Sequence, residues 1–250
     1  MEPSPRLVAF DLDGTLAESK TPMTKDMGVL LARLLNKVPV AVMSGGSFPQ
    51  FERQFFPGLP EGQPLGALYM FPTSGAQCYR HEGGSWKLVY DCSFDEEEQQ
   101  RIIDVLCETA RMTGLDAPAR MWGHLIEDRG AQVTFSALGQ EAPLAEKQEW
   151  HKAHDADRQK MREMAAAMLP NYSVRTGGLT SIDVTRAGIT KAYGVRCLER
   201  LTMIPAADML YVGDALYEGG NDEVVKEAGV ATRQVSGPEE TAGVIEGLVR

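Results

Sequence analysis

The chain has 250 residues, 43% of them hydrophobic, and a formal net charge of −10. This length fits one large domain or two modest ones, and the negative charge disfavours nucleic acid or an anionic membrane as the main partner. No apolar stretch approaches the roughly 20 residues that span a bilayer, and the first residues do not resemble a secretory signal. Because the four cysteines form no CxxC pair, we expect reduced thiols and a cytoplasmic location.

The first third of the chain alternates short apolar runs with segments whose apolar residues are spaced by three and four. The apolar runs predict buried strands and the spaced pattern predicts helices. The strands are expected at 6–11, 38–43, 67–71 and 76–80, and the helices at 24–36 and 47–56. This order is typical of a parallel α/β sheet.

The middle of the chain predicts an α+β layer of its own, in which paired strands alternate with helices. Strands are expected at 86–94, in two hairpins within 124–138 and 172–186 that turn near Arg129-Gly130 and Gly177-Gly178, and helices at 94–114 and 143–168.

After Gly188 the alternation of the first third returns. Helices are expected at 189–201, 221–229 and 238–249, and strands at 209–215 and 229–235. We therefore predict a doubly wound, Rossmann-like parallel-sheet core made of residues 1–81 and 187–250, interrupted by an inserted α+β domain at 82–186.

Four polar residues stand just beyond the predicted core strands. Asp11 and Asp13 follow the first strand, Ser44 follows the second, and Asp214 lies near the end of the strand at 209–215. Ligands of open parallel sheets bind outside the carboxyl ends of the strands, so these side chains are expected to converge on one crevice. Three carboxylates there need a cation, and oxygen ligands with room for water and phosphate favour Mg²⁺.

Lys191 is the cation that we expect beside these acids. It lies in the first turn of a predicted core helix, where the helix dipole already favours anions. A point charge at that position can bind both a phosphate and a nucleophilic carboxylate.

These residues carry a resemblance to a known superfamily. DLDGT at 11–15, Ser44, Lys191 and GDALYEGGND at 213–222 follow the four-motif order of the haloacid dehalogenase superfamily of phosphotransferases. The inserted domain resembles the large α/β cap of one branch of this superfamily.

Three stretches are similar to eukaryotic-type phosphomannomutases. They are GDALYEGGND with its double glycine, RGAQVTFSALGQ at 129–140, and GGLTSIDV at 177–184. The resemblance implies a Mg²⁺-dependent enzyme that acts on a small phosphorylated sugar. It also implies a homodimer formed through the cap.

The resemblance also implies roles for individual residues. Asp11 would be the nucleophile that forms an aspartyl-phosphate, and Asp13 the general acid/base. Ser44, Gly45 and Lys191 would hold the phosphate. The metal would be held by Asp11, the Asp13 carbonyl and Asp214, with Asn221 and Asp222 supporting these ligands. The rest of the substrate would be bound by Lys20, Arg129, Gln140, Lys147, Ser181 and Asp183.

The inserted domain departs from the mutase pattern at two positions. A mutase must hold the phosphate at the far end of the sugar, and the family gathers several arginines for this purpose. Here Arg129 remains, whereas Gln140 is neutral and Lys147 lacks the bidentate fork of arginine. We therefore expect a phosphatase of hexose phosphates, with a phosphomannomutase or phosphoglucomutase as the alternative.

Other interpretations of the same residues stay open at this point. Ser44 could cap the helix that follows it, Asp222 could cap the helix at 221–229, and Arg129 could be an ordinary cation of a hairpin turn. Ser181 and Asp183 share one strand face that could point into the crevice or to water. A binding module without turnover is a third hypothesis, which the retained acid set disfavours.

Overall fold

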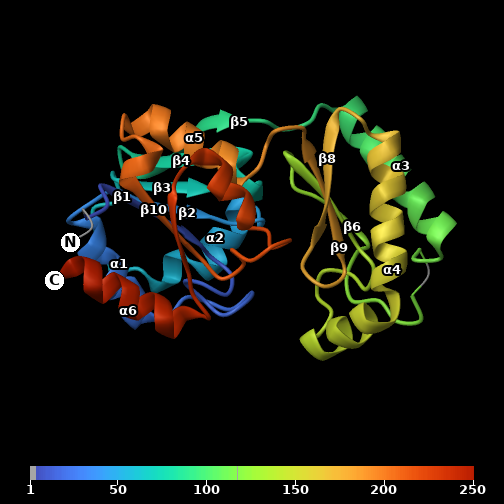
Figure 1. Ribbon diagram of the computed structural model, residues 1–250, viewed down its shortest axis with the longest axis horizontal. Coiled ribbons are helices and arrows are strands. Elements are labelled where there is room, and N and C mark those ends of the chain that lie inside the picture. The colour runs from blue at the N-terminus through green and yellow to red at the C-terminus, as the bar shows by residue number, and fades with distance from the viewer. Residues whose placement is uncertain (1–3, 117) are drawn as a thin grey trace. The chain divides into compact units, whose positions relative to one another are not determined.

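The computed structural model describes residues 4–116 and 118–250, which divide into two compact units (Figure 1). The first unit, here called the core, consists of the chain up to Asp91 together with Ile189–Arg250. The second unit, called the cap, consists of Cys92–Gly188. Within the described residues, no helix has the length and apolar character needed to cross a membrane.

The core contains a seven-stranded sheet in the order β11-β10-β1-β2-β3-β4-β5. The strands are β1 (Leu7–Asp11), β2 (Val40–Met43), β3 (Leu68–Phe71), β4 (Gln77–Glu82), β5 (Ser85–Asp91), β10 (Met209–Gly213) and β11 (Ala231–Gln234). From β11 to β3 all neighbours are parallel, and β4 and β5 are added antiparallel. A mostly parallel sheet of this kind confirms the predicted fold class.

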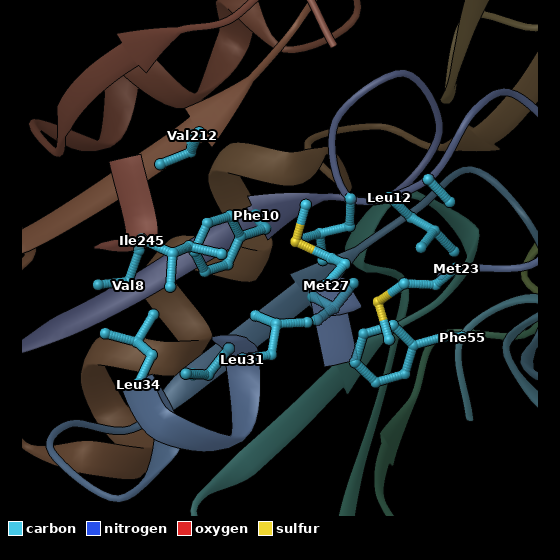
Figure 2. Packing of buried hydrophobic residues seen from close by; sticks show 14 of the residues in the cluster. Val8, Phe10, Leu12, Met23, Met27, Leu31, Leu34, Phe55, Val212 and Ile245 are labelled. Carbon is cyan, nitrogen blue, oxygen red and sulfur yellow. The ribbon is translucent and has the colours of Figure 1, made fainter. Parts of the chain in front are cut away.

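Helices cover both faces of the core sheet. Successive strand residues point to opposite faces, and the strands carry buried apolar side chains on both. Phe10 of β1 packs in one cluster with Leu31 and Ile245 (Figure 2), whereas its neighbour Ala9 packs in the other with Leu198. Three helices lie beside the first cluster: α1 (Lys25–Leu35), α2 (Phe48–Gln54) and α6 (Pro238–Val249). The helix α5 (Lys191–Thr202) lies beside the second. Short 3₁₀ turns lie at Phe56–Gly58, Thr73–Gly75, Ala206–Asp208 and Glu223–Ala228.

The cap contains a four-stranded antiparallel sheet in the order β6-β7-β9-β8 and two helices. The elements are α3 (Glu96–Thr113), β6 (Ile126–Asp128), β7 (Gln132–Ser136), α4 (Leu144–Met168), β8 (Tyr172–Gly177) and β9 (Ser181–Arg186). Phe135 and Ile182 from the sheet share a buried cluster with Leu106 of α3 and Met161 of α4. The helices therefore cover one face of this sheet.

The predicted start of the inserted domain at residue 82 was wrong. The strand expected at 86–94 is β5, and it pairs with β4 in the core sheet, with Glu82 opposite Ser85. Gly83 (φ 59°) and Gly84 (φ 81°) form the tight turn between them, because a two-residue hairpin loop of this kind needs two positive φ angles. Periodicity identified the strand, but it could not show which sheet the strand joins.

The residues at the two ends of the cap are joined by one ion pair. Arg186 donates from Nη1 to Glu98 Oε1 (2.6 Å) and from Nη2 to Glu98 Oε2 (2.5 Å), and its Nε and Nη2 also donate to the carbonyls of Cys92 and Ser93 (3.2 and 3.1 Å). Hydrogen bonds from Arg186 lower the pKa of Glu98. The pair therefore ties the beginning of the cap to its last strand.

We predict that Glu98→Gln lowers the free energy of unfolding at neutral pH. Because the folded-state pKa of Glu98 lies below its unfolded value of about 4.3, the stabilisation is present above that pH and is lost as the pH falls through the folded pKa. The gap between variant and wild type in urea unfolding should therefore narrow as the pH is lowered below about 4.3. Glu97→Gln, an exposed change on the same turn of α3, is the control and should leave no comparable gap.

Candidate active site

The ends of three neighbouring parallel strands bring the acids of the predicted motifs together. β1 ends at Asp11, β2 is followed by Ser44, and β10 is followed by Asp214. Since β2 and β10 flank β1 in parallel register, their carboxyl ends meet at one edge of the sheet. Carboxylate oxygens of Asp11, Asp214 and Asp222 lie within 4.8 Å of one another at this edge.

Lys191 is buried among these acids at the first residue of α5. Its Nζ donates to Asp11 Oδ1 and to Asp222 Oδ1 (2.6 Å), and only 2% of the residue is exposed. Burial alone would lower the pKa of Lys191, but the two carboxylates outweigh this effect and raise it. The ammonium is therefore a fixed positive charge beside the proposed nucleophile.

Asp222 is held by three donors and orients Lys191. Its side chain accepts hydrogen bonds from Lys191 Nζ, from Tyr211 Oη (2.7 Å) and from the Ala215 backbone N–H (3.2 Å). A Cβ at Gly213 would lie 2.4 Å from Asp222 Oδ2, so only glycine fits there. Asp222 occupies the N-cap position of the 3₁₀ turn at 223–228, but its side chain makes no capping hydrogen bond there.

Asp11 and Asp214 are the two carboxylates best suited to hold a divalent cation. Burial raises the pKa of both groups, and the neighbouring acids raise it further, while Lys191 works in the opposite direction. A cation between the two would remove this repulsion, and paired carboxylate oxygens suit Mg²⁺. The oxygens of Asp222 are already bonded, so Asp222 supports this set from behind; Asn221 has an exposed position.

Gly14 and Thr15 fix Asp214 in place, and sequence analysis did not assign them a role. Gly14 has φ 81°, and a Cβ there would lie 2.5 Å from Asp214 Oδ2. Thr15 is fully buried, and its Oγ1 donates to Asp214 Oδ1 (3.4 Å). In DLDGT, the glycine thus leaves room for the Asp214 carboxylate, and the threonine donates a hydrogen bond to it.

Ser44 belongs to a loop held by hydrogen bonds and does not cap α2. The N-cap residue of α2 is Ser47, whereas Ser44 Oγ accepts from the Gly46 N–H (3.0 Å). The backbone N–H groups of Thr73 and Ser74 donate to the carbonyls of Gly46 and Ser44 (both 2.8 Å). The loop around Gly45 is therefore braced from the end of β3, which suits it to hold a phosphate.

Asp13 receives donors from several directions. The backbone N–H of Lys20 donates to Oδ1 (2.7 Å), so Lys20 reaches this site through its main chain, with φ 59°. Gln50 and Gln54 of α2 also donate to Asp13. The sequence pattern predicted neither glutamine, although their spacing of four residues places them on one helix face.

The remaining predicted substrate residues all lie in the cap. Arg129 Nη2 contacts Glu127 Oε2 (2.7 Å), and Lys147 Nζ donates to the carbonyl of Gln140 (3.1 Å). Asp183 accepts from Thr134 Oγ1 (2.7 Å), and burial raises the pKa of its carboxyl.

Ser181 and Asp183 are on the face of the cap sheet opposite to the helices. They alternate along β9 with Ile182 and Val184, which are buried in the cluster with α3 and α4. Ser181 and Asp183 therefore point away from the hydrophobic core of the cap.

Comparison with known proteins supports the resemblance. The family model described as "Eukaryotic phosphomannomutase" matches residues 27–250. The chain belongs to this family. The matched region includes Ser44, Lys191 and Asp214, whereas Asp11 and Asp13 lie before it.

Individual relatives agree with this assignment. The chain is 28% identical over 249 residues to a phosphomannomutase of Encephalitozoon cuniculi, covering 93% of this chain and 89% of the relative. It is 25% identical over 248 residues to a phosphomannomutase of Saccharomyces cerevisiae, covering 97% and 93%. As a family member, the chain is a haloacid-dehalogenase-type enzyme.

Solved structures support the fold at lower identity. An IMP-nucleotidase of Plasmodium falciparum superimposes with a TM-score of 0.72 at 16% identity, covering 98% of this chain and 70% of that one. A trehalose-6-phosphate phosphatase of Aspergillus fumigatus gives 0.58 at 16% identity, covering 98% and 93%. This phosphomannomutase-family chain therefore shares its fold with phosphatases.

We predict that Lys191→Met lowers the free energy of unfolding by about 3–5 kcal/mol, because it leaves two carboxylates buried without their cation. Urea unfolding measures this loss. Lys37→Met, at an exposed position, should change the stability little and serves as the control. If Lys191→Met lowered the free energy of unfolding no more than Lys37→Met, the stabilising role that we assign to this ion pair would be contradicted.

We predict opposite effects of Asp214→Asn on stability and on metal binding. Without Mg²⁺ the variant should be more stable than wild type at pH 7, because one repelling charge is removed, and the difference should shrink at lower pH as Asp214 itself takes up a proton. Mg²⁺ affinity by titration calorimetry should fall about 10-fold or more. Unchanged affinity would exclude Asp214 as a ligand.

Proposed function

We propose that the chain is a Mg²⁺-dependent phosphohexomutase that moves a phosphoryl group between the 1- and 6-positions of a hexose through Asp11. The observation that carries the proposal is the Asp11 carboxylate, held against the buried Lys191 ammonium at the carboxyl edge of the sheet in a chain of the phosphomannomutase family. Asp13 stands two residues away as the group that exchanges protons with the sugar.

The steps follow from what each residue can do. An Asp11 oxygen attacks one phosphorus of a hexose 1,6-bisphosphate as its bond to the sugar oxygen breaks, and Asp13 protonates that oxygen, which leaves a hexose monophosphate. In the second half, a sugar hydroxyl attacks the phosphoryl group on Asp11 while Asp13 takes the hydroxyl proton. Ser44 and Lys191 bind the phosphoryl oxygens. Mg²⁺, held by Asp11, Asp214 and the Asp13 carbonyl, would neutralise charge on the transferring group.

The cap residues would recognise the rest of the substrate. We assign the distal phosphate to Arg129 and Lys147, which carry positive charge, and the sugar hydroxyls to Ser181 and Asp183. A mutase needs both, because the two ends of the sugar take turns at Asp11. Dimerisation through the cap and a cytoplasmic location stay predictions.

A phosphatase of hexose phosphates is the second candidate. The substitutions in the cap led us to expect a phosphatase, and family membership favours the mutase instead. Gln140 favours the phosphatase because its side chain is neutral and gives the distal phosphate no charge to bind. Lys147 donates to the Gln140 carbonyl, and Arg129 is paired with Glu127. Each of these cations already has a contact within the cap.

³¹P NMR separates the two candidates. The enzyme is incubated with Mg²⁺ and mannose 1-phosphate, with and without a trace of glucose 1,6-bisphosphate. We expect a 6-phosphate signal that depends on the bisphosphate. Growth of inorganic phosphate at the same rate in both tubes would contradict the mutase and support the phosphatase, and Asp11→Asn should abolish either reaction.

We predict that Gln140→Arg raises the ratio of isomerisation to hydrolysis, because a guanidinium can hold the distal phosphate with two parallel hydrogen bonds. The same NMR assay gives both rates. Gln148→Arg adds the same charge at an exposed position of α4 and should leave the ratio unchanged. Equal changes in the two variants would mean that the charge acts non-specifically.

A further inference from the structure

We infer that Gln50 and Gln54 form an amide clamp that positions Asp13, leaving Asp13 Oδ2 as the oxygen that exchanges the proton with the substrate. The inference rests on the proposed function insofar as Asp13 is the general acid/base. Neither glutamine belongs to the four motifs from which the site was predicted.

The two amides form a connected pair on α2. Gln54 Nε2 donates to Asp13 Oδ1 (2.9 Å), Gln50 Nε2 donates to Asp13 Oδ2 (3.2 Å), and Gln50 Nε2 also donates to Gln54 Oε1 (2.8 Å). Only this orientation of the two amides presents a donor to every acceptor. Because one amide restrains the other, the clamp holds both oxygens of the carboxylate at once.

The two oxygens of Asp13 are not equivalent. Oδ1 accepts from Gln54 and from the Lys20 backbone N–H (2.7 Å), which uses both of its lone pairs. Oδ2 accepts from Gln50 Nε2 at 3.2 Å and from Ser44 Oγ at 3.5 Å, and both hydrogen bonds are longer than the two to Oδ1. Oδ2 is therefore the oxygen with capacity for a proton, and it lies on the side of the Ser44 loop.

The packing around the clamp shows that the fold reserves space for it. A Cβ at Gly46 would lie 2.0 Å from Gln50 Oε1, so glycine in the Ser44–Gly46 loop is what allows Gln50 to take this position. Gln54 is 4% exposed, and its carbonyl accepts from the Met23 N–H (2.7 Å), which fixes the end of α2. The same loop thus serves the phosphate and the general acid/base.

In chemical terms, the clamp fixes the direction of two proton transfers. While the Asp11–phosphorus bond forms and the phosphorus–oxygen bond of the substrate breaks, the proton on Oδ2 passes to the leaving oxygen. While the acceptor oxygen attacks the phosphorus and the Asp11–phosphorus bond breaks, the acceptor proton passes to Oδ2. The amides donate hydrogen bonds and exchange no proton, so they are positioning residues.

The test compares leaving groups in Gln54→Met and Gln50→Met, which keep the side-chain length and remove the amide. The value of kcat/KM is measured with Mg²⁺ for p-nitrophenyl phosphate and phenyl phosphate, and for mannose 1-phosphate with a trace of glucose 1,6-bisphosphate added. p-Nitrophenolate leaves without a proton, whereas the other two need one. We expect a loss of about 10-fold or more for phenyl phosphate and mannose 1-phosphate, and under about 3-fold for p-nitrophenyl phosphate.

Gln77→Met is the matched control. Gln77 is also a buried glutamine of the core, and its Nε2 donates to Asp91 Oδ1 (3.1 Å), joining β4 to β5. Its removal costs the same kind of hydrogen bond and should not discriminate between leaving groups. Gln50 is less buried than Gln54, so Gln50→Met keeps the test available if Gln54→Met fails to fold.

The outcomes separate the clamp from the proposed function. Equal losses for phenyl and p-nitrophenyl phosphate in both variants, or a selective loss in Gln77→Met as well, would overturn the clamp. A wild type that cleaves both aryl phosphates but does not consume mannose 1-phosphate would overturn the proposed function, while the aryl pair still tests the clamp. A wild type inert to all three would overturn both.

Discussion

The buried Lys191 ammonium, in contact with Asp11 and Asp222, is the interaction on which the rest of the site depends. Charges so far from water are tolerated only where each has an oppositely charged or hydrogen-bonding partner. Here α5 supplies the lysine at its first residue, β1 supplies Asp11 at its last, and Tyr211 completes the set around Asp222. The pairing fixes where the strand edge and the helix start must meet.

Around this charged group the structure arranges two kinds of support. Glycines allow close approach, as at Gly213 beneath Asp222 and at Gly14 beside Asp214, where any side chain would collide with a carboxylate. Amides and hydroxyls then direct the acids, Thr15 toward Asp214 and the pair Gln50 and Gln54 toward Asp13. The glycines allow the backbone to lie close to the carboxylates. The amide and hydroxyl donors determine which carboxylate lone pairs remain available for chemistry.

The sequence predicted those parts of the structure that have a local signature. Apolar runs identified the strands of the core sheet, and the ends of those strands identified Asp11, Ser44 and Asp214. Partners chosen by tertiary structure had no such signature. β5 looks the same in periodicity whichever sheet it joins, and Tyr211, inside an apolar run, resembles an ordinary core residue. Glutamines on a short helix resemble a solvated face until their contact with Asp13 is known.

The most direct test of the account is to find where the phosphoryl group is held during turnover. The enzyme is mixed with Mg²⁺ and glucose 1,6-bisphosphate, quenched in acid within one turnover, digested, and examined by peptide mass spectrometry. We expect one added phosphoryl group on the peptide that contains Asp11, and none in Asp11→Asn. Turnover of the bisphosphate without a phosphorylated Asp11 peptide, or with the phosphoryl group on another residue, would contradict it.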